Sequence, residues 1–324
     1  MVRLVARAAV DEAARRASER LHHDPVQRHF SSDLAETATR LWARRFELID
    51  DPDRLHRISC GSFAAHTYPR ASVELVELGA NLIAWLFLFD DRHGEGKALP
   101  EMVITFERCE AVIREGRVSA DPFSRALADL RERAVRLGAS DDWLAGFAES
   151  LGRYFSGCVL EFPHRMQNRP PTLSTYRQLR CWSIGAYPVF DLIELAEGAP
   201  SYQARFRLGE LRFLGALLCS WVNDIYSHRK EQHDCDPLNL VTVLARERSL
   251  DIEDAYDAAV DLYHEDLGKF SSACEALIGV GDVNDIDRSI ARGLADWVHG
   301  NCAWTRTSGR YRAEVTSNEP RLPR

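Results

Sequence analysis

Three oxygen-bearing side chains, Asn223, Ser227 and Glu231, follow one another at four-residue intervals. In an α-helix each such step turns about 400°, so the three side chains share one face with a drift of about 40° per step. Amide, hydroxyl and carboxylate oxygens are ligands that Mg²⁺ prefers. Because residues 217–222 are apolar, we expect a buried helix, whose polar stripe needs partners. A metal ion and a diphosphate would supply them, and Lys230 adds a positive charge.

An acidic cluster follows an apolar run far upstream of this motif. Residues 85–89 read Trp-Leu-Phe-Leu-Phe, and Asp90, Asp91 and Glu95 come soon after them. Adjacent carboxylates at the end of a buried helix repel each other and cost stability unless a cation compensates. On their own, these residues are also typical of a solvated acidic helix end. Two oxygen-rich clusters on different helices, facing each other across a cavity, would form a clamp for metal ions and a diphosphate.

Several further side chains offer hydrogen-bond donors to phosphate oxygens. Arg310 and Tyr311 are adjacent, and Arg177 and Arg180 are three residues apart. A guanidinium group and a phenol hydroxyl both donate to phosphate. Residues three apart on a helix are neighbours on its surface, so the sequence leaves open which of Arg177 and Arg180 faces a cavity. These residues are informative as site candidates only because the two oxygen-rich motifs occur in the same sequence.

Helical periodicity recurs along almost the whole sequence, and alternating strand patterns are nearly absent. Clusters of glycine, proline and polar residues separate the periodic segments. The pattern predicts one all-α domain over residues 1–324. The predicted helices cover residues 3–22, 32–50, 72–91, 100–115, 122–137, 141–161, 173–197, 203–231, 237–247, 252–278 and 283–304.

The predicted 173–197 helix contains Gly185 and Pro188. Proline lacks a backbone donor and clashes with the carbonyl four residues before it, so we expect an interruption here. A break in the helix would leave backbone groups free to point into a cavity. A simple kink between two packed helices explains the same residues equally well.

Composition narrows the class of protein. Of 324 residues 45% are hydrophobic, which is ample for a buried core, and the net charge of −8 argues against a nucleic-acid partner. Eight cysteines occur without a CxxC pair, as expected of buried thiols in a reducing compartment. The apolar stretch 82–89 is too short to cross a bilayer, and residues 1–7 do not read as a signal peptide. We therefore expect a cytoplasmic protein without a membrane partner.

These motifs, in this order on an all-helical chain, resemble the bacterial class I terpene synthases over roughly residues 55–312. The resemblance extends to the segments that flank the motifs. Its residues are Asp90-Asp91 with Glu95, Asn223-Asp224-x-x-Ser227-x-x-Lys230-Glu231, Arg310-Tyr311, Thr67–Ala71, Tyr176–Arg180, and Trp297–Asn301 followed by Trp304.

The resemblance implies an all-α bundle around a central apolar cavity, and a carbon–oxygen lyase that acts on a linear isoprenyl diphosphate with three Mg²⁺ ions. Two ions would bind at Asp90, with help from Asp91 or Glu95, and the third at Asn223, Ser227 and Glu231. Arg180, Lys230, Arg310 and Tyr311 would donate to the diphosphate. Phe87 and Trp297 would line the cavity, followed by Phe63 and Trp304, for which ordinary core packing is the better expectation. Farnesyl diphosphate is the first expected substrate and geranylgeranyl diphosphate the second.

The same architecture leaves two other functions open. A chain-elongating prenyltransferase would need a second aspartate-rich motif, where this sequence has Asn, Ser and Glu. A non-catalytic helical protein would bind isoprenoid diphosphates without turnover. The resemblance also implies a homodimer. Residues 1–50 differ from the expected N-terminal segment by beginning with a basic amphipathic helix, and residues 312–324 are expected to form a flexible tail.

Overall fold

The computed structural model describes residues 2–21, 24–49, 51–94, 99–198, 202–279 and 285–311. Within these ranges every regular element is helical and none is a strand, which confirms the predicted all-α class. The helices are α1 (Val2–Arg20), α2 (Ser32–Arg45), α3 (Pro52–Ile58), α4 (Cys60–Thr67), α5 (Val73–Phe89), the π-turn η1 (Asp90–Gly94), α6 (Leu99–Glu115), α7 (Pro122–Arg136), α8 (Asp141–Met166), α9 (Leu173–Ser183), α10 (Ala186–Ala196), α11 (Tyr202–Arg207), α12 (Gly209–Asp234), α13 (Leu240–Arg248), α14 (Ile252–Gly279) and α15 (Asp285–Thr307).

Polar side chains start many of these helices by accepting from free backbone N–H groups of the first turn. Ser72 caps α5 by accepting from the Leu75 N–H at 3.2 Å. Asp121 caps α7, which has proline in its first turn, and Thr172 caps α9. Asn239 caps α13 by accepting from the Val241 N–H at 2.9 Å. Local sequence therefore fixes where α5 and α9, which carry Phe87 and Arg180, begin, whereas α12 has no side-chain cap.

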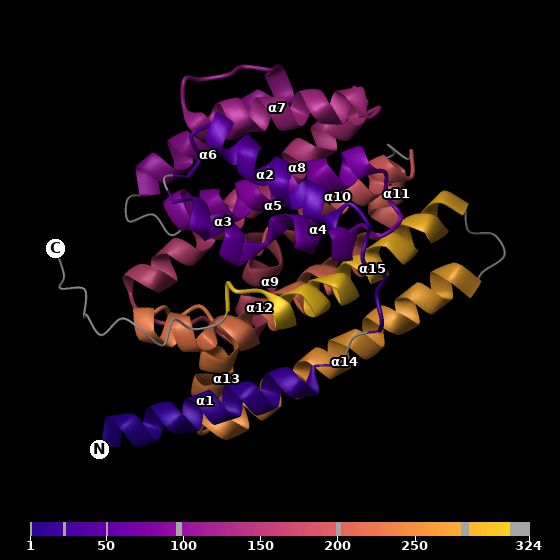
Figure 1. Ribbon diagram of the computed structural model, residues 1–324. Helices are drawn as coiled ribbons and strands as arrows, with labels where there is room; N and C mark the ends of the chain where they lie inside the picture. The colour runs from indigo at the N-terminus through magenta and orange to yellow at the C-terminus, as the bar shows by residue number, and fades with distance from the viewer. Residues whose placement is uncertain are drawn as a thin grey trace.

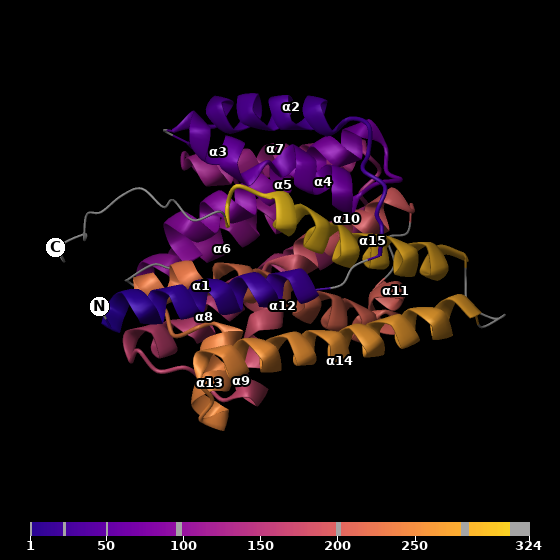
Figure 2. The ribbon, with the colours of Figure 1, turned by 60° about the horizontal axis from the view of Figure 1, so that its bottom comes forward.

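The helices wrap around the apolar α5 in the upper part of the molecule, where α2, α4, α7, α8 and α10 surround it (Figure 1). The long helices α12 and α14 pack against each other, and α1 lies along both (Figure 2). Helix α15 runs between α12 and α4 and contacts both. Helices α5, α8, α9, α12 and α15 therefore meet around the middle of the bundle. Within the described ranges no helix combines the length and apolarity needed to cross a membrane.

The predicted interruption of the 173–197 segment is confirmed. Gly185 adopts the left-handed conformation with φ of 72°, separating α9 from α10. A positive φ costs glycine little because it has no Cβ. Pro188 then lies in the first turn of α10, where its missing donor would be unpaired in any helix.

Other predicted boundaries were wrong. The 203–231 segment divides at Leu208 into α11 and α12, and α12 continues to Asp234. The second helix ends at Arg45 rather than at residue 50, and α3 and α4 had no predicted counterpart. The 72–91 helix ends at Phe89 and passes into the wider turn η1, which contains Asp90 and Asp91. The predicted tail, residues 312–324, lies outside the described residues.

Candidate active site

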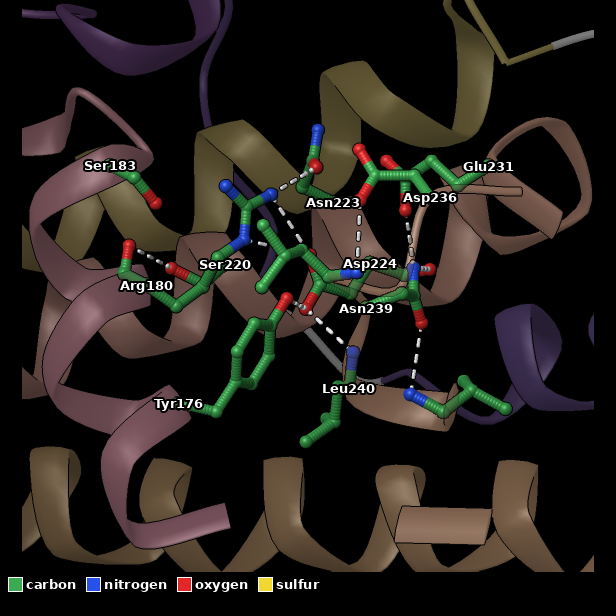
Figure 3. Close-up of polar contacts among 12 residues, drawn as sticks. Tyr176, Arg180, Ser183, Ser220, Asn223, Asp224, Glu231, Asp236, Asn239 and Leu240 are labelled. Atoms are coloured by element: carbon green, nitrogen blue, oxygen red, sulfur yellow. Dashed lines mark hydrogen bonds and ion pairs between the residues drawn. The ribbon is translucent and has the colours of Figure 1, made fainter. Parts of the chain in front are cut away.

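Asn223, Ser227 and Glu231 lie on one face of α12, as their spacing predicts. The helix is buried over Leu214–Val222, so this face starts from inside the bundle. Asn223 is held at both ends of its amide. Its Oδ1 accepts from Arg180 Nη2 at 2.7 Å, and its Nδ2 donates to the Tyr311 hydroxyl at 2.8 Å. Figure 3 shows Asn223 and Arg180 pointing toward each other from α12 and α9.

The Glu231 side chain contacts the residue that caps α13. Its Oε2 accepts from Asn239 Nδ2 at 2.7 Å, and the same amide group donates to the Asp224 carbonyl at 2.8 Å. Asn239 is fully buried, so these two bonds fix its orientation. Burial, and then the negative charge of Asp224, raise the pKa of Glu231 to about 7. A bound cation would lower the pKa of Glu231 again, because it favours the ionised carboxylate.

The Ser227 hydroxyl lies between Asn223 and Glu231 on the same face. It is buried and makes no hydrogen bond of ordinary geometry with any described residue, although it lies close enough to Glu231 to favour that carboxylate weakly. A buried hydroxyl without a good partner is uncommon. An amide oxygen, a free hydroxyl and a carboxylate that gains from a nearby cation are a donor set that fits Mg²⁺.

Arg180 and Arg177 have different surroundings. Arg180 Nε donates to Asp224 Oδ1 at 3.0 Å, in addition to its bond with Asn223. Tyr176 completes this cluster by donating to Asp224 Oδ2 at 2.7 Å (Figure 3). Arg177 instead forms a two-point ion pair with Asp266 of α14, at 2.8 and 3.0 Å. The geometry thus favours Arg180 as the arginine beside the candidate metal motif.

Asp90 and Asp91 have opposite electrostatic environments. Asp90 Oδ1 accepts from the Tyr154 hydroxyl of α8 at 3.0 Å, and burial raises the pKa of Asp90. Burial also opposes ionisation of Asp91, but the charges and hydrogen bonds of Arg310 and Arg54 outweigh it and leave the pKa of Asp91 below its ordinary value. Asp91 is therefore already charge-compensated by protein groups, whereas Asp90 is the carboxylate that gains more from an added cation.

Arg310 and Tyr311 connect the two motifs directly. Arg310 Nη2 donates to Asp91 Oδ1 at 3.4 Å, and the next residue, Tyr311, accepts from Asn223 Nδ2 at 2.8 Å. Asp91 and Asn223 are far apart in the sequence, yet each contacts one member of this dipeptide. The structure thus places the acidic motif and the α12 motif on two sides of one site.

Aromatic rings pack beneath this polar site. The Arg310 guanidinium lies 4.4 Å from the centre of the Phe87 ring. Phe63 stacks on Trp304 at 3.9 Å between ring centres and lies 5.3 Å from Trp297. Phe87 is partly exposed, whereas Phe63, Trp297 and Trp304 are buried. The packing role expected for Phe63 and Trp304 agrees with this stacking, and the lining role of Phe87 and Trp297 stays a prediction, as does the central cavity.

Two candidate residues are not placed against these partners. Lys230 is exposed on α12, next to Glu231 but outside the buried cluster. Glu95 lies outside the described residues, so its role as a ligand stays a prediction. Among the described residues no group of three or more His, Cys, Asp or Glu side chains is arranged to hold a metal. Among the candidate ligands on α12 only Glu231 is a carboxylate, and the acidic motif without Glu95 contains two.

The sequence reasoning missed residues that hold the candidate ligands in place. Tyr154 orients Asp90, and Asn239 orients Glu231. Asp224 belongs to the motif, but nothing in the sequence predicts its pairing with Arg180 and Tyr176. The only sequence signal for Asn239 is its position as a polar cap before the apolar start of α13.

Comparison with known proteins agrees with this fold. The structure matches α-eudesmol synthase with a TM-score of 0.77 at 21% identity, covering 89% of this chain and 99% of that one. It matches hedycaryol synthase in complex with nerolidol with a TM-score of 0.73 at 22% identity, covering 89% and 98% of the two chains. At these identities the matches establish the fold, an all-helical terpene synthase fold.

Sequence comparison establishes the family. The family model described as terpene synthase family 2, C-terminal metal binding, matches residues 81–269. (+)-T-muurolol synthase of Roseiflexus castenholzii is 33% identical, over 89% of this chain and 91% of that protein. Germacrene A synthase of Nostoc punctiforme is 29% identical, over 89% and 92%. The chain belongs to terpene synthase family 2 and is a class I terpene synthase.

Proposed function

We propose that this enzyme is a Mg²⁺-dependent cyclase that converts farnesyl diphosphate into a cyclic sesquiterpene hydrocarbon or alcohol and diphosphate. The observation that carries the proposal is the contact of Arg310 with Asp91 and of Tyr311 with Asn223, because it brings both motifs to one site. The choice of farnesyl diphosphate as substrate is based on relatives. The names of (+)-T-muurolol synthase and of (-)-alpha-amorphene synthase from Streptomyces viridochromogenes state that they cyclise farnesyl diphosphate.

Three Mg²⁺ ions would be divided between two walls of the site. Asp90, with Asp91 or Glu95, would hold two of them, and the α12 motif would hold the third through the set Asn223, Ser227 and Glu231. When bound, the ions supply positive charge that stabilises the departing diphosphate. The Ser227 hydroxyl, which has no hydrogen bond of ordinary geometry, and the raised pKa of Glu231 support a cation at α12.

The chain's own donors would orient the diphosphate between these walls. Arg180, Arg310 and Tyr311 are half-buried and contact the two motifs, and Lys230 is exposed on α12. When the C–O bond of the substrate breaks, its electron pair leaves with the diphosphate, and an allylic cation remains. Donors fixed in a site with little water stabilise the leaving charge without needing to reorganise.

The apolar part of the substrate would lie against the aromatic cluster. Phe87 and Trp297 would offer ring faces whose quadrupole stabilises a passing carbocation. In ring closure a double bond of the substrate attacks the cationic carbon, which forms a C–C bond and moves the positive charge to another carbon of the substrate. The reaction ends by loss of a proton, or by addition of water followed by loss of a proton. Exclusion of bulk water by the surrounding helices therefore decides whether the product is a hydrocarbon or an alcohol.

Product analysis tests the proposal. Purified protein is incubated with Mg²⁺ and with geranyl, farnesyl or geranylgeranyl diphosphate, and the products are identified by gas chromatography with mass spectrometry. The proposal expects a cyclic product from farnesyl diphosphate. Glu231→Gln should lower turnover at least 100-fold, while Glu132→Gln, a control on the exposed side of α7, should not. A linear C20 diphosphate formed after addition of isopentenyl diphosphate would instead identify a prenyltransferase, and binding without any product would identify a non-catalytic protein.

A further inference from the structure

Helix α8 carries further polar side chains on the same face as the tyrosine that contacts Asp90. Tyr154, Glu161 and Arg165 follow at steps of seven and four residues, so they lie along one face of α8. Tyr154 donates to Asp90 Oδ1 at 3.0 Å. Glu161 accepts from the Ser183 hydroxyl, where α9 ends at the helix break. This face of α8 therefore runs from the acidic motif toward the other wall of the site.

Arg165 continues this face to the α12 side. Its Nε donates to Asp236 Oδ2 at 3.1 Å, and its Nη2 lies 3.0 Å from Glu161 Oε2. Asp236 belongs to the turn between α12 and α13, and its backbone N–H donates to the Glu231 carbonyl at 2.9 Å. Arg165 is thus attached to the turn that directly follows the candidate metal ligand Glu231.

The Arg165 charge also reaches the opposite motif. Burial raises the pKa of Asp90, and the positive charge of Arg165 acts against it by favouring the ionised carboxylate. The Arg165 side chain remains 25% exposed, although its pKa is held above the ordinary value because the charges of Glu161, Asp236 and Asp90 outweigh burial. One arginine therefore lies within electrostatic reach of both walls and still contacts solvent.

The guanidinium retains unused donor capacity. Nε and Nη2 are engaged by the two carboxylates, whereas Nη1 has no hydrogen-bond partner among the described residues and is not a buried unpaired atom. Arginine carries five N–H donors, and its planar fork suits phosphate oxygens. Arg180 and Arg310 are likewise paired with carboxylates in this structure. All three of these arginine side chains are therefore paired with carboxylates.

We propose that Arg165 is a further diphosphate-binding residue, which approaches the diphosphate from α8 between the two metal motifs. The inference rests on the proposed function and adds a donor that no resemblance assigned. Arg165 Nη1 donates to a phosphate oxygen while Glu161 and Asp236 hold the rest of the guanidinium in place. The rival role is purely structural, in which Arg165 only fastens the 235–239 turn through Asp236.

Calorimetric titration with inorganic pyrophosphate in the presence of Mg²⁺ separates these roles without relying on turnover. Loss of a charge-assisted bond from Arg165→Gln should weaken pyrophosphate binding roughly 10- to 100-fold. Asp236→Asn removes the ion pair but keeps Arg165, so binding should remain within a few-fold of wild type or tighten. Arg169→Gln, an exposed arginine four residues further on, is the control and should bind as wild type does.

The outcomes are distinguishable. If Arg165→Gln and Asp236→Asn weaken binding equally, and the double variant loses no more than either, Arg165 is only structural and the inference is wrong. Unchanged binding by Arg165→Gln overturns it as well. If wild type itself shows no Mg²⁺-dependent binding of pyrophosphate, the proposed function fails instead. Should Arg165→Gln fail to fold, Arg165→Lys keeps the charge without the fork, and its binding should fall between those of wild type and Arg180→Gln.

Discussion

Gly157 lies where α8 touches the end of α9, and Gly157→Ala is expected to disturb the site through the backbone. A Cβ at this position would lie 2.6 Å from the Ser183 backbone nitrogen and 3.0 Å from the Trp182 carbonyl carbon. Both contacts are with backbone, so no flexible side chain is able to move aside. Ser183 ends the helix that carries Arg180, which donates to Asn223. Relief of the clash therefore requires α9 to shift away from α8.

Two effects of opposite sign determine how much Gly157→Ala changes the free energy of unfolding. Overpacking in a well-filled core costs about 1–3 kcal/mol. Alanine gains about 1 kcal/mol over glycine in a helix interior. Because the clash involves two backbone segments, we place overpacking at the upper end and expect a net loss of about 1–2 kcal/mol in the free energy of unfolding. Displacement of Arg180 should also lower turnover of farnesyl diphosphate roughly 10- to 100-fold.

Urea unfolding followed by circular dichroism, together with turnover of farnesyl diphosphate, measures both effects. Gly268→Ala in α14 is the matched control, because a Cβ there meets nothing within 4 Å. It should stabilise the protein by about 0.5–1 kcal/mol and leave turnover unchanged. If Gly157→Ala proves as stable and as active as Gly268→Ala, the close contact between α8 and α9 does not exist in solution and the reasoning is refuted.

Three further predictions concern the α12 side of the site. The pKa of Glu231 rises from 4.5 to about 7 on folding, so its contribution to the stability of the metal-free protein is present below pH 4.5 and lost as the pH rises to about 7. Relative to Glu231→Gln, the free energy of unfolding of wild type should fall by about 2.5 kcal/mol between pH 5 and 8 in EDTA, and parallel curves would contradict this. Asn239→Leu should lower the free energy of unfolding by about 1–3 kcal/mol, because it removes the side chain that donates to Glu231 and to the Asp224 carbonyl and that caps α13. It should also raise the Mg²⁺ concentration for half-maximal activity, whereas an unchanged Mg²⁺ dependence would show that Asn239 does not orient Glu231. Removal of metal by EDTA should abolish turnover and excess Mg²⁺ should restore it, and turnover that persists in EDTA would exclude a metal-dependent mechanism.

Local chemistry explains why much of the fold was predictable from the sequence. The spacing of Asn223, Ser227 and Glu231 is a property of the helix itself, and the structure places them on one face. The break at Gly185 follows from the conformational freedom of glycine and the missing donor of proline. The division of the 203–231 segment at Leu208 has a weaker signal, because Gly209 follows it without a positive φ and without a proline nearby.

Contacts between distant helices explain what the sequence left open. Arg177 and Arg180 are equivalent by spacing, and only the position of Asp266 on α14 draws Arg177 away from the site. Tyr154 and Asn239 have ordinary local surroundings, and their roles appear only when α8 and the start of α13 are placed against the candidate ligands. The homodimer implied by the resemblance stays a prediction, since it depends on a surface pairing outside a single chain.

A crystal structure with Mg²⁺ and pyrophosphate would show directly whether the two motifs bind one diphosphate. We expect one metal bound by oxygens of Asn223, Ser227 and Glu231, further metal at Asp90, and the pyrophosphate between them in contact with Arg310 and Tyr311. Pyrophosphate bound elsewhere, or metal coordinated at only one of the two motifs, would contradict it.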